Sequence, residues 1–171
     1  MGIRVWLCLV GVHAAALVAA PWPAQGPSVA TAPVSPVRAT EAVSNDPDDP
    51  ALWVHPRDAS RSLILGTDKL AGTGALFVFG LDGVRRQVLA PLDRPNNVDV
   101  EYGVPAPGGR VDIAVVTERM KHRLRVYRIL PDGSGLVDAV PNGVPVLEGE
   151  AGAEGEPMGI ALYRRPHDAA V

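Results

Sequence analysis

Ser62-Leu-Ile-Leu-Gly-Thr-Asp-Lys69 recurs as Asp112-Ile-Ala-Val-Val-Thr-Glu-Arg119, and this repeat decides the fold. Leu76-Phe-Val-Phe79 likewise returns as Leu124-Arg-Val-Tyr127, and Asp82-Gly83 as Asp132-Gly133. The offsets are 50, 48 and 50 residues. A four-stranded unit that recurs at about this period is typical of a β-propeller blade, although a plain antiparallel sandwich also has regular short strands.

Around the repeat, short apolar runs alternate with turn residues, and no long stretch has a helical period. We therefore expect an all-β chain with almost no helix. The expected strands are 51–54, 62–67, 75–79, 84–89, 97–102, 111–117, 124–129 and, weakly, 144–147, with 159–163 opening a further one. These make two blades plus the first strand of a third. Because a propeller needs at least about four blades to close, we expect the chain to be an N-terminal fragment of a longer protein.

The N-terminal region resembles an export signal. Arg4 is followed by an apolar run over 5–20 that is short for a membrane span. The sequence predicts a signal peptide over 1–20, a Pro/Ala-rich linker over 21–40 and a partial propeller over 41–171. Cleavage could follow 18–20 or 28–30, and an uncleaved membrane anchor is the alternative. The protein is then secreted or periplasmic, and its one cysteine, Cys8, lies inside the signal.

The composition and net charge limit the classes of binding partner that we expect. The chain has 171 residues, a net charge of −3 and a pI near 5.8. This balance argues against binding nucleic acid, which needs a basic face. We expect no membrane association after signal removal and a monomer at full length.

Two clusters rich in Asp and Asn are candidate metal sites: 45–50, which includes Asp48 and Asp49, and 96–102. Calcium takes six to eight oxygen ligands from such groups. A turn is the simpler explanation of the first cluster. In the second, alternation along a strand places Asn97, Asp99 and Glu101 on one face, as a solvated edge strand can also do.

Lys69 and Arg119 occupy equivalent positions in the two repeats. Converging cations suit an anionic ligand such as phosphate, whereas local salt bridges to Asp68 and Glu118 are the alternative.

Lys121, His122, Arg123 and Arg125 add charge that a solvated hairpin explains, and His55 fits a turn or core role. Metal-activated water attacking a substrate held by cations is the chemistry these residues could support.

The chain resembles the β-propeller phytases, or alkaline phytases, over about residues 41–165. The segments that carry the resemblance are 48–56, 62–69, 76–83, 96–103, 111–119 and 156–163. The resemblance implies a six-bladed propeller that binds several calcium ions and hydrolyses phytate, a 3-phytase-type activity, with a calcium-bound water. Carried over by motif, calcium ligands are expected at Asp48, Asp49, Asn97, Asp99 and Val100, partly through backbone carbonyls. Lys69 and Arg119 become phosphate contacts, and the catalytic residues are left unassigned.

Three positions depart from the family pattern. Met158 stands where the family commonly has a Tyr that touches phosphate, Glu118 replaces a frequent Asn, and Glu101 replaces a frequent Arg. Each change makes the pocket less positive or less able to donate hydrogen bonds. A secreted propeller that binds a phosphorylated or sugar ligand without turnover is therefore the alternative function, and a purely structural or interaction propeller is a third.

Overall fold

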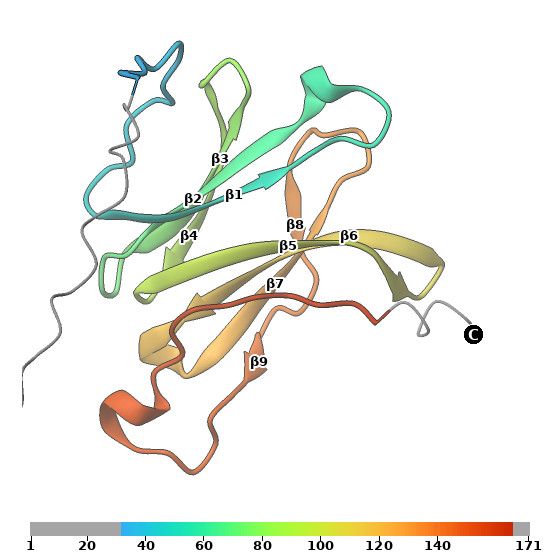
Figure 1. Cartoon of the computed structure of the whole chain (residues 1–171). Helices are drawn as coiled ribbons and strands as arrows, with labels where there is room; N and C mark the ends of the chain where they lie inside the picture. Colours follow the sequence, from blue (N-terminus) through green and yellow to red (C-terminus); the bar gives the residue numbers. More distant parts are fainter. Residues whose placement is uncertain (1–31, 166–171) are drawn as a thin grey trace, which may run out of the picture. The chain divides into compact units, whose positions relative to one another are not determined.

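The computed structural model describes residues 32–165 (Figure 1). The expected signal peptide and residues 21–31 of the expected linker lie outside these residues. Residues 32–46 contain neither helix nor strand, and the described strands all lie in the compact unit that begins at Pro36. Within residues 32–165 no helix is long and apolar enough to cross a membrane.

The described residues form nine strands, three short 3-10 helices and no α-helix. The strands are β1 (Pro47–Trp53), β2 (Leu63–Asp68), β3 (Gly74–Gly80), β4 (Arg85–Leu92), β5 (Pro95–Ala106), β6 (Gly109–Glu118), β7 (Arg123–Ile129), β8 (Leu136–Asp138) and β9 (Val144–Pro145). The 3-10 helices are η1 (Ala59–Arg61), η2 (Arg119–Lys121) and η3 (Gly152–Gly155).

The strands form two antiparallel meanders, here called blade 1 and blade 2 (Figure 1). Blade 1 has the order β1-β2-β3-β4, and blade 2 has the order β5-β6-β7-β8, with β9 paired to β7. The first strand of each blade, β1 in blade 1 and β5 in blade 2, is called the inner strand below. The predicted all-β, partial-propeller architecture is thus confirmed.

The turns follow the repeat as well. Gly83 and Gly133 end the equivalent Asp-Gly pairs, and both have positive φ, of 81° and 70°. A Cβ on Gly133 would lie 2.4 Å from the carbonyl oxygen of Arg61. Glycine at this position is therefore required both by the turn and by the close contact between the two loops.

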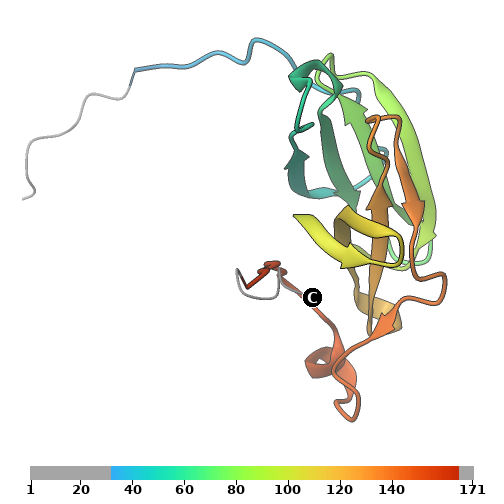
Figure 2. The ribbon, with the colours of Figure 1, turned by 90° about the vertical axis from the view of Figure 1, so that its right-hand side faces the viewer.

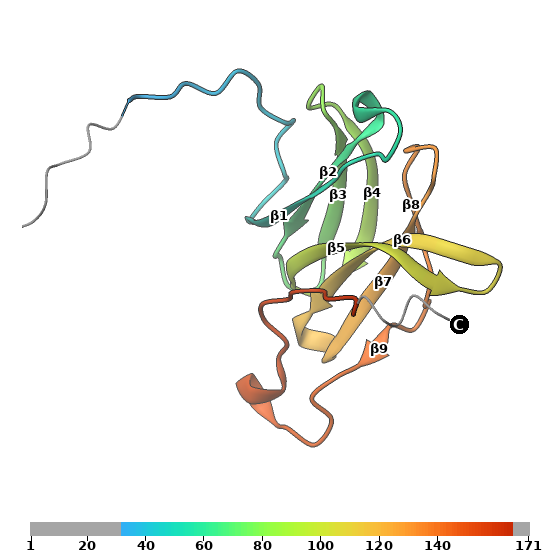
Figure 3. The ribbon, with the colours of Figure 1, turned by 45° about the vertical axis from the view of Figure 1, so that its right-hand side comes forward.

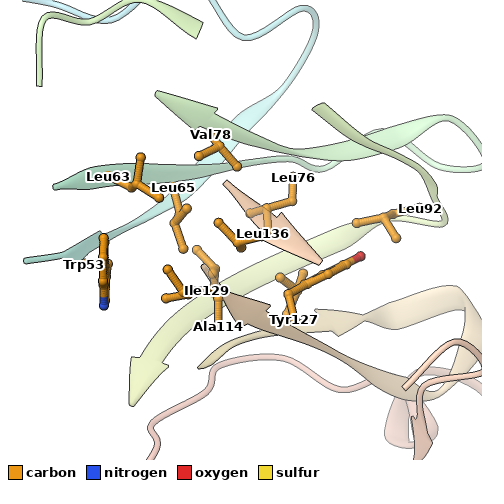
Figure 4. Close-up of a cluster of buried hydrophobic side chains, with 12 residues drawn as sticks. Trp53, Leu63, Leu65, Leu76, Val78, Leu92, Ala114, Tyr127, Ile129 and Leu136 are labelled. Carbon is orange, nitrogen blue, oxygen red and sulfur yellow. The ribbon is translucent and has the colours of Figure 1, made fainter. Parts of the chain in front are cut away.

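The hydrophobic core lies between the two blades, where their facing side chains interdigitate (Figure 4). Blade 1 contributes Trp53, Leu63, Leu65, Leu76, Val78 and Leu92, and blade 2 contributes Val98, Ala114, Val116, Tyr127, Ile129 and Leu136. Figure 2 shows the strands of both blades from the side. A second cluster on the other face of blade 1 packs Ala75, Phe77 and Phe79 with Val43 and Ile64.

Polar contacts also join the blades. The Trp53 indole donates to Asp112 at 2.8 Å. Gln87 on β4 makes two hydrogen bonds with the backbone of Leu136 on β8, at 2.9 and 2.8 Å. His55 is buried, its Nδ1 accepts from the amides of residues 57 and 58, and its Nε2 lies 3.0 Å from the Pro131 carbonyl oxygen. The turn or core role expected for His55 is therefore confirmed.

One predicted strand is absent. Residues 159–163 are extended and form no sheet in the described chain. They run beside β5, and the amides of Gly159, Leu162 and Arg164 bond to side chains rather than to a neighbouring backbone (Figure 3). The apolar pattern of this segment predicted a strand, and it could not reveal that the amides bind side chains of β5 instead of a neighbouring backbone.

Candidate functional site

The candidate site is built where β1 and β5 begin. Pro50 pairs with Gly66 across β1 and β2, and Val98 pairs with Val116 across β5 and β6. Since Gly66 and Val116 are equivalent in the repeat, so are Pro50 and Val98. Counting back along each inner strand makes Asp49 equivalent to Asn97 and Asp48 equivalent to Asn96.

A threonine hydroxyl fixes each inner strand at this point. Oγ1 of Thr67 accepts from the Asp49 amide at 3.0 Å, and Oγ1 of Thr117 accepts from the Asn97 amide at 2.9 Å. The Thr67 hydroxyl also donates to the Asn96 carbonyl oxygen at 2.9 Å and so joins the two blades. Both threonines are buried.

Lys69 follows β2 and is held by carboxylates of the β1 region. Its Nζ lies 2.8 Å from Asp48 and 3.9 Å from Asp46. The hydrogen bond to Asp48 raises the pKa of Lys69 above its usual value. The alternative partner from the sequence, Asp68, does not pair with Lys69, because its carboxylate accepts from the Asp46 amide at 2.8 Å and the Asn45 side chain at 2.9 Å.

Arg119 follows β6 and is held in the same way. Its amide donates to the Arg94 carbonyl at 3.2 Å, as the Lys69 amide donates to the Asp46 carbonyl at 2.9 Å. Its guanidinium forms an ion pair with Glu156 and lies 3.5 Å from Oδ1 of Asn96, the residue equivalent to Asp48. Its Nε is buried and finds no acceptor within residues 32–165.

Glu118, the sequence-based partner of Arg119, points elsewhere. It is buried, accepts from the Asp93 amide at 2.9 Å and pairs with Arg123 at 2.6 Å and Arg125 at 3.7 Å. The alternative pairing of Lys69 and Arg119 with Asp68 and Glu118 is therefore wrong. Both cations nevertheless carry a carboxylate partner.

The cluster of cations after β6 is paired as well. Lys121 lies 3.4 Å from Asp93, and Arg125 forms an ion pair with Asp138. The guanidinium of Arg125 also lies over the Tyr127 ring, 5.7 Å from its centroid. A solvated hairpin therefore explains the exposed Lys121 but not Arg125, whose side chain is largely buried on β7.

The expected calcium ligands have oxygen chemistry that suits a hard cation. In the described part of the chain, no three His, Cys, Asp or Glu side chains converge in a metal-binding group. Asp48 is engaged by Lys69, and Asp49 accepts from the Val98 amide through Oδ2 at 3.0 Å. The carboxylate oxygens of Asp48 and Asp49 are of the kind that calcium prefers, and both residues already have partners within the chain.

The side chains expected as ligands on β5 are already hydrogen-bonded. Oδ1 of Asn97 accepts from the Asn96 side chain and from the Gly159 amide, both at 2.8 Å. The two carboxylate oxygens of Asp99 accept from the amides of Val100 and Leu162, at 2.8 and 2.7 Å. The amide oxygen of Asn97 has both lone pairs in use.

The three departures lie in different surroundings. Met158 is 60% exposed, on the segment that follows η3. Glu101 accepts from the amides of Tyr102 at 2.7 Å and Arg164 at 3.2 Å. Glu118 is buried and paired, so its charge is neutralised by Arg123 and Arg125 rather than directed at the site.

Sequence reasoning missed Glu156 as the partner of Arg119. The sequence contains a weak signal for this position. A charged residue directly precedes a proline at the start of β1, of β5 and of the segment beside β5, and these residues are Asp46, Arg94 and Glu156. It also missed the two threonine hydroxyls, although Thr67 and Thr117 stand at equivalent places in the repeat. Their role depends on which backbone amide lies opposite, and a repeat alone does not show that.

The sequence model of the phytase family matches residues 5–164. The chain belongs to the phytase family. It is also 34% identical over 118 residues to a 3-phytase of Bacillus subtilis (strain 168), a match that covers 68% of this chain and 29% of that relative. The match thus spans about three-tenths of the length of this curated phytase.

Proposed function

We propose that the complete protein is a secreted, calcium-dependent phosphomonoester hydrolase acting on phytate, of the 3-phytase type. The carrying observation is that a phytase-family chain presents Lys69 and Arg119 at equivalent blade positions, each held beside the start of an inner strand. The fixed guanidinium fork of Arg119 and the ammonium of Lys69 suit the oxygens of a phosphate monoester. A monomer at full length is part of the same proposal.

Calcium is proposed to bind at Asp48 and Asp49, with Asn97, Asp99 and Val100 contributing through backbone carbonyl oxygens. Among the described hydrogen bonds none reaches Oδ1 of Asp49, which leaves this oxygen for a cation. Calcium, when bound, supplies a polarised water and neutralises phosphate charge. The chain's own residues then orient the ester: Lys69 and Arg119 hold its oxygens, and the two threonines hold the inner strands in place.

A second candidate is a propeller that binds a phosphorylated or sugar ligand without turnover. The ion pairs favour it, because Asp48 and Glu156 already partly neutralise the two cations. Exposed Met158, which cannot donate a hydrogen bond, favours it as well.

Phosphate release from phytate by the complete protein, with calcium and with chelator, separates these candidates. We expect calcium-dependent release, and Arg119→Ala should lose about 1.5–3 kcal/mol of transition-state stabilisation, the range for a hydrogen bond to a charged group. Arg86→Ala is the matched control, because Arg86 forms a surface pair with Asp82 at 2.5 Å in the β3–β4 hairpin. Tight phytate binding without release would establish the second candidate.

A further inference from the structure

The polar face of β5 holds a neighbouring segment of the chain. Asn97, Asp99 and Glu101 alternate along the strand, and their side-chain oxygens accept from the amides of Gly159, Leu162 and Arg164 at 2.8, 2.7 and 3.2 Å. The red segment beside β5 in Figures 1 and 3 is this stretch, residues 159–164. Side-chain oxygens of β5 thus accept the backbone amides that carbonyl oxygens would accept in a β-sheet.

The same device joins β1 to β5. Asp49, the equivalent of Asn97, accepts from the Val98 amide at 3.0 Å. One position carries a carboxylate and the other an amide, yet both accept one backbone N–H from the next inner segment. The property that the two positions share is an acceptor oxygen of the right length, and negative charge is not part of it.

The held segment begins with residues of the candidate site. Glu156, which pairs with Arg119, lies three positions before Gly159, and Met158 lies beside it. Because the Gly159 and Leu162 amides are fixed to β5, the backbone that carries Glu156 is fixed relative to Arg119, which follows β6 of the same blade.

From these contacts we infer that Asn97 and Asp99 are positioning residues. Their side chains hold residues 156–164 against β5, set where Glu156 meets Arg119 and do not serve as calcium ligands. The link to phosphate binding rests on the function proposed for Arg119. The link between β5 and the segment rests on the hydrogen bonds alone.

Matched variants of the complete protein test this inference. Asn97→Asp keeps the acceptor oxygen and adds a charge, and Asp99→Asn removes the charge but keeps one acceptor oxygen for the Leu162 amide, whereas Asp99→Ala and Asn97→Ala remove the acceptor. Amide hydrogen exchange at Gly159 and Leu162 reads the contacts directly. We expect exchange at the affected amide to speed up by about tenfold or more in the alanine variants and to stay close to wild type in the acceptor-keeping variants.

Two further readouts separate positioning from metal binding. The rise in melting temperature on adding calcium chloride should be the same in Asp99→Asn as in wild type, whereas a ligand role predicts that it falls. The KM for phytate should rise in Asn97→Ala and return to the wild-type value in Asn97→Asp. If an alanine variant does not fold, the two folded acceptor-keeping variants carry the test through their exchange rates and calcium response.

Unchanged amide exchange in the alanine variants would overturn the inference, as would loss of the calcium response in Asp99→Asn with exchange unchanged. Failure of the proposed function looks different. In that case wild-type protein releases no phosphate, while the exchange differences between matched variants persist.

Discussion

Glu118 is a buried carboxylate that organises one corner of blade 2. It is 2% exposed and joins the Asp93 amide, Arg123 and Arg125. Asp68, its equivalent in blade 1, is equally buried but accepts from neutral donors of residues 45 and 46. The acid at this position therefore has a conserved task within the repeat, which is to bind the turn that leads into an inner strand.

Removing this acid should destabilise the protein strongly. Glu118→Ala leaves Arg123 without its carboxylate and Arg125 with Asp138 alone, and breaking a buried pair costs about 3–5 kcal/mol. Glu118→Asp is the control, because blade 1 already uses an aspartate at the equivalent position. Urea unfolding of the complete protein measures both variants. If Glu118→Ala were as stable as Glu118→Asp, the arginines would be solvated rather than held by this residue.

At the scale of the element, β7 carries a titratable group into the inter-blade core. Tyr127 is 2% exposed, and burial raises the pKa of its phenol to about 12 from the ordinary value of 10.0. The folded state therefore binds the phenolic proton more tightly than the unfolded chain does. This contribution to stability is complete below pH 10 and is lost as the pH rises towards 12.

The stability of the protein at alkaline pH should depend on the phenolic proton of Tyr127. Two pKa units correspond to about 2–3 kcal/mol, so the free energy of unfolding should fall by roughly that amount between pH 10 and pH 12. Tyr127→Phe should remove this part of the pH dependence. Chemical denaturation along a pH series, with phenolate absorbance as the second signal, measures it. A wild-type profile as flat as that of Tyr127→Phe would contradict a buried phenol.

How far the sequence predicts the elements depends on the strand. The short apolar runs of β2, β3, β6 and β7, bounded by turn residues, were predicted within one or two residues. β8 was missed because a three-residue strand has too few side chains to show a period, and β9 is shorter than predicted for the same reason. The stretch over 159–163 was predicted as a strand because it is a short apolar run, but strand pairing is decided by backbone partners that its own sequence does not contain.

At the scale of the whole molecule, the site is assembled from both blades and from the segment after η3. Sequence equivalence located Lys69 and Arg119 correctly at matching positions, but it did not predict that Asp48 pairs with Lys69. Their actual partners come from contacts between residues 21 and 37 positions apart, so local sequence could not reveal them. The predicted calcium ligands stay a prediction.

Calcium should stabilise the complete protein. A ligand that binds only the folded state adds about 2.7 kcal/mol when its concentration is a hundredfold above Kd. The melting temperature should therefore be higher in calcium chloride than in chelator, and Asp49→Ala should reduce the difference. Magnesium chloride at the same ionic strength is the control for screening. Equal melting temperatures in calcium and chelator would remove calcium from the proposal.

The apolar layer shared by the two blades has a consequence for how this family can change over time. Each meander contributes six of the twelve buried side chains of the inter-blade core, so neither forms this core alone. A recombination event that replaces one whole meander therefore keeps only half of a matched set, and the new half must fit side chains it never evolved beside. Every strand from β1 to β8 contributes to this layer, so an exchange of sequence that keeps the packing intact must move the two meanders together.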